Sequence, residues 1–187
     1  MSYFLTLSGS PTKFSKAGFL LRSIESILQQ RAIEFRAIHA LDLPPTDPAT
    51  RQIANRFIAD TVEEVQQAVA IALLTPATKE SSPTLLGSLL NVLPDNAFLK
   101  KPLLLFATGG LPGQVVILER ALKPILFRLG TTTIAARVHV GTGSWILVGD
   151  DHPRLSRGVE REAAYAIDLV LRAANLQEAS LEAAVLR

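Results

Sequence analysis

Short apolar runs alternate with longer amphipathic segments along most of this chain. The short runs predict strands at 2–7, 33–38, 69–74, 103–107 and 132–140. Between them, apolar residues recur at helical spacing, which predicts helices at 17–30, 50–68, 85–92, 114–129 and 157–175. The third strand is continuously apolar, as is typical of a central parallel strand. This repeated order of strand and helix favours a doubly wound α/β sandwich.

Three segments complicate this pattern. The Lys-Pro pair at 123–124 lies inside the fourth helix, and it predicts either a kink or a first helical turn that restarts at the proline. The Gly-Thr-Gly triplet at 141–143 separates strand-like segments at 132–140 and 145–148, so we expect the last strand to carry a hairpin extension. The Ala/Leu/Glu-rich tail, 176–187, is either a further short helix or a frayed end.

Composition narrows the class of protein. The 187 residues are 48% hydrophobic and 19% charged, which suits a single domain over 1–187 with a sizeable core. The formal net charge is only +2, and no cluster of Lys and Arg is interleaved with aromatic residues. These features argue against a nucleic-acid partner.

Cysteine usage and apolar run length bear on the compartment. The chain has no cysteine, which excludes disulfides, thiolate metal sites and cysteine nucleophiles, and fits a reducing compartment. No signal peptide is evident, and no apolar run reaches the roughly 18 to 20 residues that span a bilayer. We therefore expect a cytoplasmic protein without a membrane partner.

Three loops are candidates for a ligand site. In doubly wound folds, ligands sit at the carboxyl ends of the strands, near the point where strand order reverses. The loops at 9–16, 75–83 and 108–114 meet this description, and all three are rich in Gly, Pro, Ser and Thr. Their agreement is a stronger signal than any one loop, for which the alternative is an ordinary βα turn.

The first loop has the chemistry of an anion site. It joins a strand to a helix N-terminus, where the first N–H groups lack internal partners and the helix dipole favours negative charge. Ser10 and Ser15 add hydroxyl donors, and Lys13 or Lys16 adds a positive charge. The expected guest is a phosphate group. The alternative is a simple turn with a serine N-cap, because the Walker and dinucleotide glycine patterns are absent.

The second and third loops suit a flat ligand. Pro76 lacks an N–H donor and turns the chain off the sheet, so the N–H groups after it are free to face a ligand. Gly109, Gly110 and Gly113 let the backbone approach such a ligand closely. Together, the three loops predict a site for a flat, phosphorylated molecule.

The sequence contains no evident set of catalytic side chains. The Asp-Asp-His run at 150–152 fits a solvated turn better than a metal site, because adjacent residues rarely point at one ion. Ser10 lacks the Gly-x-Ser-x-Gly pattern of a nucleophile elbow, so a phosphate-ester hydrolase built on Ser10 would need a base elsewhere. A bound cofactor with its own chemistry explains the missing acid–base pair better.

Three stretches together resemble a known family. They are LSGSP at 7–11 with Ser15 and Lys16, TPATK at 75–79 with LLNVLP at 89–94, and ATGG at 107–110 with ALKPIL at 121–126. They resemble the NADPH-dependent FMN reductases of the flavodoxin-like fold, most closely the sulfonate-assimilation FMN reductase branch. The resemblance covers most of the chain, through about residue 130.

The resemblance implies a fold and an activity. The fold is a flavodoxin-like three-layer sandwich with a five-stranded parallel sheet in the order 2-1-3-4-5. The activity is that of an NAD(P)H-dependent flavin oxidoreductase, which binds FMN and NADPH and passes a hydride from NADPH to the flavin. The family forms homodimers or homotetramers. Because residues 85–93 form a helix that is apolar on most of its surface, we expect it at a subunit contact.

The resemblance also assigns residues to the flavin. The first loop is expected to hold the phosphate, the second to run along the isoalloxazine ring and ribityl chain, and the third to support the other edge of the ring. In that order, the residues are Ser10, Ser15 and Lys16 with backbone at Ala17 and Gly18, then Pro76, Ala77, Thr78 and Lys79, then Thr108, Gly109 and Gly110.

The chain departs from the family pattern after the first loop, in the second loop and in one helix. Ala17 and Gly18 replace serines that donate to phosphate, and each such hydrogen bond is worth roughly 1.5–3 kcal/mol. Thr78 replaces a tyrosine beside the flavin. Arg120 replaces the tyrosine that widens a helix into a π-bulge at an oligomer contact in the sulfonate branch. The alternative function is therefore a flavodoxin-like flavin-binding or regulatory protein with weak or lost reductase activity.

Overall fold

A parallel five-stranded sheet forms the centre of the computed structural model, which describes residues 3–44, 51–77, 84–131, 133–147 and 153–185. Its strands are β1 (Tyr3–Ser8), β2 (Phe35–His39), β3 (Ala68–Pro76), β4 (Leu103–Thr108) and β5 (Ile134–Val140). Neighbouring strands pair in parallel in the order β2-β1-β3-β4-β5. The flavodoxin-like strand order is therefore confirmed, with the reversal between β1 and β3.

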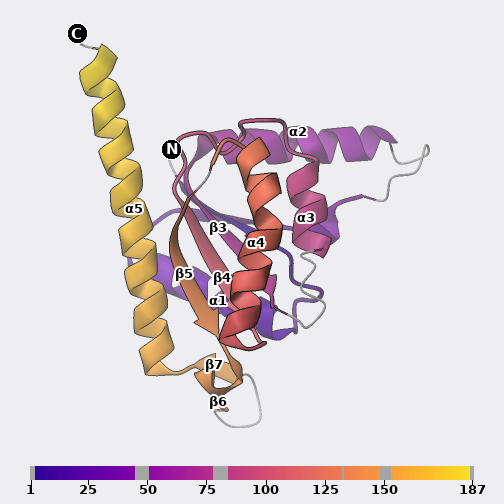
Figure 1. Ribbon diagram of the computed structural model, residues 1–187, viewed down its shortest axis with the longest axis vertical. Coiled ribbons are helices and arrows are strands. Elements are labelled where there is room, and N and C mark those ends of the chain that lie inside the picture. The colour runs from indigo at the N-terminus through magenta and orange to yellow at the C-terminus, as the bar shows by residue number, and fades with distance from the viewer. Residues whose placement is uncertain (1–2, 45–50, 78–83, 132, 148–152, 186–187) are drawn as a thin grey trace.

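Helices cover both faces of the sheet. They are α1 (Lys16–Gln30), α2 (Arg51–Gln67), α3 (Thr84–Asn91), α4 (Pro112–Arg128) and α5 (Arg157–Val185), with a short 3-10 turn, η1, at Ala40–Asp42. Side chains of α1 and α5 pack with one face of the strands, and those of α2, α3 and α4 pack with the other. Alternate strand residues belong to these two cores, as the two-residue period of a strand requires. The three-layer sandwich is thus confirmed (Figure 1).

The hairpin expected after the last strand is absent from the described structure. Residues Thr142–Ser144 form a 3-10 turn, η3, in which the Ser144 N–H donates to the Gly141 carbonyl over 3.2 Å. The next strand, β6 (Trp145–Leu147), pairs antiparallel with β7 (Pro153–Leu155) and not with β5. The prediction was wrong because the glycine-containing triplet takes a helical turn, which carries the chain away from the edge of the sheet.

Of the two alternatives at Pro124, a restart of the helix is wrong, and a kink stays a prediction. One α-helix, α4, runs from Pro112 to Arg128 with Pro124 inside it. Pro124 has no N–H for the carbonyl of Arg120, and both residues are exposed, so this break in the hydrogen bonding lies on the solvent side. No π-helical residue occurs in α4, in keeping with the replacement of the branch's tyrosine by Arg120.

Two further predictions concern the subunit contact at α3 and the structure of the C-terminal tail. The apolar side chains at Leu86, Leu89, Leu90 and Leu93 are buried in the chain's own core, which accounts for their character without a second subunit. The subunit contact at α3 stays a prediction. Helix α5 continues to Val185, so most of the tail is helical, and it extends past the sheet (Figure 1). Within the described residues, no helix is both long and apolar enough to cross a membrane.

Candidate ligand site

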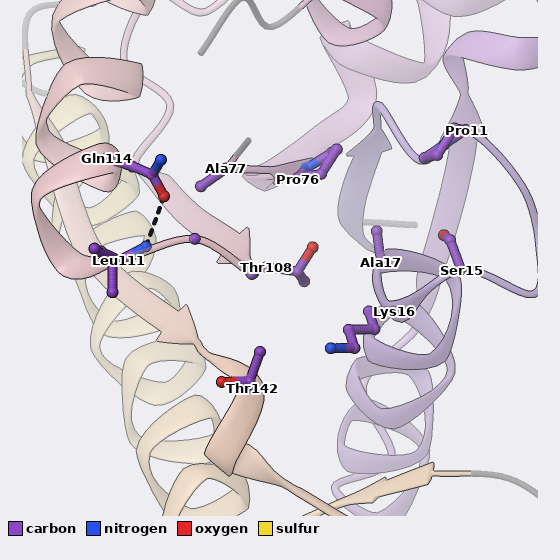
Figure 2. Close-up of a pocket in the computed structure, with 12 residues that line it drawn as sticks. Pro11, Ser15, Lys16, Ala17, Pro76, Ala77, Thr108, Leu111, Gln114 and Thr142 are labelled. Carbon is purple, nitrogen blue, oxygen red and sulfur yellow. Dashed lines mark hydrogen bonds between the residues drawn. The ribbon is translucent and has the colours of Figure 1, made fainter. Parts of the chain in front are cut away.

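A cavity of about 520 Å³ lies where β1, β3 and β4 end, at the carboxyl edge of the sheet. All three candidate loops contribute to it, which confirms that they meet in space (Figure 2). The residues that line it are Pro11, Ser15, Lys16, Ala17, Pro76, Ala77, Thr108, Gly109, Gly110, Leu111, Gln114 and Thr142. This volume falls within the range of about 300–1,000 Å³ that is typical of small-molecule sites.

The N-terminus of α1 forms one end of the cavity. Ser15 is the N-cap, and its Oγ accepts a hydrogen bond of 3.1 Å from the Gly18 N–H. The N–H groups of Lys16 and Ala17 have no hydrogen-bond partner in the part of the chain that the structure describes. The Lys16 side chain extends toward Thr108 and Thr142 (Figure 2). Free N–H groups and an ammonium group therefore face the same space, which favours an anion there.

The hydroxyls of the first loop are held by the loop itself. Ser10 Oγ and Ser15 Oγ lie 2.6 and 2.9 Å from the carbonyl oxygen of Thr12, and 2.6 Å from each other. Ser10 is buried and does not line the cavity. Gly18 lies directly under the loop, so close that a Cβ there would collide with the carbonyl of Lys13. Either serine can donate to a ligand only after its hydroxyl rotates away from Thr12.

The second loop forms the apolar wall of the cavity. Pro76 ends β3, and the Ala77 N–H donates to the Thr108 carbonyl over 2.8 Å, which ties this loop to the third. Ala77 is buried, and both residues line the cavity. Thr78 and Lys79 lie outside the described residues, so their predicted roles beside the flavin stay predictions.

The third loop approaches the second closely because it contains glycine. Gly109 and Gly110 have φ angles of +72° and +66°, in the left-handed region that favours glycine. A Cβ on Gly110 would collide with the Ala77 carbonyl and with Oε1 of Gln114. That same Oε1 accepts a hydrogen bond of 2.7 Å from the Leu111 N–H and so caps the start of α4. The backbone is thereby exposed to the cavity without an intervening side chain.

A histidine supports this glycine loop from behind. His139, near the end of β5, has its Nε2 2.8 Å from the Gly109 carbonyl oxygen. Because a carbonyl oxygen only accepts, Nε2 carries the hydrogen. The Gly109 N–H in turn donates to the Val140 carbonyl over 2.9 Å. The turn after β4 is therefore fixed to β5 on both sides of Gly109.

Sequence reasoning located most of the cavity, but it missed several residues. Of the predicted residues, eight line it, namely Ser15, Lys16, Ala17, Pro76, Ala77, Thr108, Gly109 and Gly110. The four residues that were missed are Pro11, Leu111, Gln114 and Thr142. Three of these lie inside the candidate loops and could have been included. Thr142 follows β5, so its signal was only that it comes after the carboxyl end of a strand.

The electrostatics of the cavity are simple. Among its lining residues, all of them described, Lys16 carries the one charged side chain. No group of three or more potential metal ligands occurs among the described residues. The Ser10 hydroxyl contacts the Thr12 carbonyl and Ser15, neither of which can act as a base, so this geometry does not support a hydrolase. The arrangement favours a ligand that carries negative charge at one end.

Comparison with known proteins identifies the family. A family model of NADPH-dependent FMN reductases matches residues 3–144, which include β1 to β5 and the three loops. The chain belongs to this family. The match ends at η3, so β6, β7 and α5 lie beyond it.

Individual relatives share this family and its fold. The chain is 31% identical over 125 residues to an FMN reductase (NADPH) of Pseudomonas putida, covering 67% of the chain and 64% of that protein. It is 30% identical to an FMN reductase (NADPH) of Escherichia coli, covering 67% and 65%. The chain thus spans just under two thirds of these relatives. An apo NADH:FMN oxidoreductase superimposes with a TM-score of 0.67 at 26% identity, over 89% of this chain and 86% of that one.

Proposed function

We propose that this protein is an NAD(P)H-dependent FMN reductase, which transfers a hydride from NADPH to FMN. The observation that carries the proposal is the cavity at the strand ends, where a cationic helix N-terminus faces a glycine loop across an apolar wall. The family membership and the names of the relatives support the same activity.

The residues at the α1 end suit the FMN phosphate. The unpaired N–H groups of Lys16 and Ala17, the Lys16 ammonium and the Ser15 hydroxyl are donors or positive charges, and no carboxylate lines the cavity. Because Ala17 and Gly18 have no hydroxyl, this set relies on backbone N–H groups and one ammonium. Such a set of donors binds a dianionic phosphate more strongly than a neutral group, because hydrogen bonds to a charged acceptor are stronger than those between neutral groups.

The residues at the other end suit a flat ring. Pro76 and Ala77 offer apolar surface, and the Gly109–Gly110 backbone offers peptide groups without side chains. When bound, the flavin itself supplies the hydride chemistry. The chain's residues then have three tasks, which are to bind the phosphate, to orient the ring and to exclude water from one side of it.

An alternative within the same fold is a flavin-binding or regulatory protein with weak or lost reductase activity. Two observations favour it. The Ser10 and Ser15 hydroxyls are engaged by the Thr12 carbonyl, and Ala17 and Gly18 supply none. Both proposals require FMN binding, so they differ only in the turnover of NADPH.

The test combines binding and turnover on one pair of variants. We expect FMN to bind the purified protein with quenching of its fluorescence, and NADPH oxidation to depend on added FMN. Gly110→Ala is expected to lose most of the binding, because its Cβ would collide with the Ala77 carbonyl at a φ of +66°. The control is Gly113→Ala, where a Cβ would meet nothing within 4 Å.

The outcomes separate the two functions. Binding and turnover in both the wild type and Gly113→Ala, with loss in Gly110→Ala, support the reductase. Binding without turnover favours the regulatory alternative. The absence of FMN binding at micromolar concentration would refute both.

The finer assignments are also proposals. The sulfonate-assimilation branch is supported by the TPATK and ALKPIL motifs, although Arg120 departs from it. A homodimer or homotetramer is supported by three exposed apolar side chains on α4, since Val116, Ile117 and Phe127 are 52%, 53% and 74% exposed. The exposed, charged Arg120 and Lys123 lie between Val116 and Phe127 on the same side of the helix. A cytoplasmic location stays a prediction of the sequence.

A further inference from the structure

The peptide group between Gly109 and Gly110 can rotate more easily than most, and its carbonyl is held by one hydrogen bond within the described residues. Both residues are glycines with positive φ, so no Cβ limits rotation on either side of this peptide. On one side, the Gly109 N–H is bonded to Val140, and on the other the Leu111 N–H is bonded to Gln114. Within the described residues, the contact on the Gly109 carbonyl is the 2.8 Å hydrogen bond from His139.

The direction of that carbonyl fixes the direction of the next N–H. In a trans peptide, the C=O and the N–H point in opposite directions. Since the Gly109 carbonyl is directed at His139, the Gly110 N–H is turned away from His139. This N–H has no hydrogen-bond partner in the described part of the chain. Gly109 and Gly110 line the cavity, whereas His139 is half-buried behind them and does not.

We propose that His139 is a positioning residue that locks this peptide, so that the Gly110 N–H is offered to an acceptor atom on the edge of the flavin ring. The inference rests on the proposed function, and it adds a residue that the loop motifs do not contain. Without the imidazole, the peptide is free to rotate and to turn its carbonyl oxygen toward the cavity. The Gly109 carbonyl oxygen would then face the acceptor atom of the ring and repel it, whereas the Gly110 N–H would bind that atom.

In this proposal, His139 affects the binding of the flavin ring and not of the phosphate. A comparison of flavins with and without a phosphate therefore tests it. His139→Asn is too short to reach Gly109, whereas His139→Gln carries an amide donor at about the reach of the imidazole Nε2. Affinity for FMN and for riboflavin, which lacks the phosphate, is measured by quenching of flavin fluorescence. We expect His139→Asn to raise both Kd values by the same factor, about three- to tenfold. We expect His139→Gln to restore both.

Two further variants act as controls. Lys16→Ala is expected to weaken the binding of FMN and to leave riboflavin unchanged, because Lys16 directly follows the N-cap of α1, where the proposed function places the phosphate. His39→Gln replaces the histidine that ends β2, the edge strand on the opposite side of the sheet from β5, and is expected to change neither affinity. Thermal unfolding of each variant separates a loss of fold from a loss of positioning.

The results distinguish this inference from the proposed function. If the wild type binds neither flavin, the proposed function fails. If the wild type binds and His139→Asn retains both affinities, the inference alone fails. It also fails if His139→Asn weakens FMN but not riboflavin, or if a folded His139→Gln does not recover binding. Should His139→Asn fail to fold, His139→Phe takes its place, because it keeps a ring but has no donor for the Gly109 carbonyl. Retained affinity for both flavins in a folded His139→Phe would then overturn the inference.

Discussion

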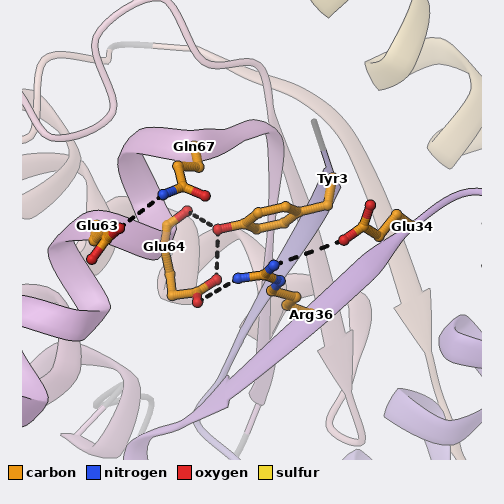
Figure 3. A network of polar contacts seen from close by, with 6 residues as sticks. All are labelled: Tyr3, Glu34, Arg36, Glu63, Glu64 and Gln67. Atoms are coloured by element: carbon orange, nitrogen blue, oxygen red, sulfur yellow. Dashed lines mark hydrogen bonds and ion pairs between the residues drawn. The ribbon is translucent and has the colours of Figure 1, made fainter. Parts of the chain in front are cut away.

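At the scale of single residues, Tyr3, at the start of β1, belongs to a network of polar contacts outside the ligand site (Figure 3). The residue is 1% exposed, and its hydroxyl lies 2.5 Å from a carboxylate oxygen of Glu64 on α2. Arg36 of β2 stacks over the Tyr3 ring and also binds Glu64 at 2.6 Å. This network joins one helix to two neighbouring strands at the end of the sheet away from the cavity.

Removal of the Tyr3 hydroxyl should lower stability and leave the ligand site unchanged. Tyr3→Phe takes a donor from a carboxylate, and we expect a loss of about 1–2 kcal/mol in the free energy of unfolding at neutral pH. The measurement is urea denaturation, with Tyr165→Phe as the control, since Tyr165 is 69% exposed. Equal stability of the two variants would contradict a structural role for this network.

The same residue predicts a response to alkaline pH. Burial, followed by the hydrogen bond to Glu64, raises the pKa of Tyr3 well above its ordinary range. The unfolded chain therefore loses this proton at a lower pH than the folded chain, so stability present below about pH 10 falls as pH rises further. We expect the stability gap between the wild type and Tyr3→Phe to narrow from about pH 9 to about pH 11. A constant gap would argue against the shift.

At the scale of elements, apolar pattern was a good guide and turn chemistry a poor one. All five core strands and four of the five helices occur within a few residues of where periodicity placed them, because burial between two layers dictates both periods. The fifth helix, α5, begins where predicted and ends ten residues later, at Val185. The Gly-Thr-Gly triplet led to the wrong prediction of a hairpin, because glycine permits several kinds of turn. The sequence also did not reveal that β6 pairs with β7 and not with β5. His139 escaped notice for the same reason, since its bond to Gly109 arises only from the pairing of β4 with β5.

An ion pair joins α4 to β5 and predicts an acid response. Arg137 binds both carboxylate oxygens of Glu119 at 2.7 Å, and this hydrogen bonding lowers the pKa of Glu119. A lowered folded-state pKa gives stability that is present above the ordinary value near 4.3 and is lost as pH falls. We expect Glu119→Gln to cost about 0.5–1 kcal/mol at neutral pH, since Arg137 is half-exposed, and this cost to shrink as the pH falls below about 4.

The measurement for this pair is chemical denaturation at both pH values. The control is Glu162→Gln, because Glu162 is exposed on α5 and has no ion pair among the described residues. A cost for Glu119→Gln that persists in acid would show that the lost interaction is packing and not charge.

At the scale of the whole molecule, the loops at three strand ends were predictable as a site because topology alone brings them together. Thr142, the lining residue after β5, was not, since its place in the cavity depends on where the chain leaves the sheet. That the chain forms a single domain stays a prediction. So does its assembly, for which the described part of α4 offers a candidate surface.

That surface is the exposed face of α4. Val116, Ile117 and Phe127 lie on it, with the exposed Arg120 and Lys123 between Val116 and Phe127. Leu111, directly before α4, is 71% exposed and also lines the cavity. A second copy seated on this face would cover apolar area and would close the cavity on the side of Leu111. We expect Phe127→Asp to convert an oligomer to a monomer, as measured by light scattering at micromolar concentration.

The matched control is Leu147→Asp, which places the same charge on an apolar residue of β6 that is 82% exposed. It should leave the mass unchanged, because β6 lies off the α4 face. The cavity adds a second readout, since a monomeric Phe127→Asp that still folds should bind FMN more weakly if the partner helps to close the site. A wild type that is monomeric, or an oligomer that survives Phe127→Asp, would exclude α4 as the contact. In that case α3, whose apolar residues are already buried in the core, would offer less surface for a replacement.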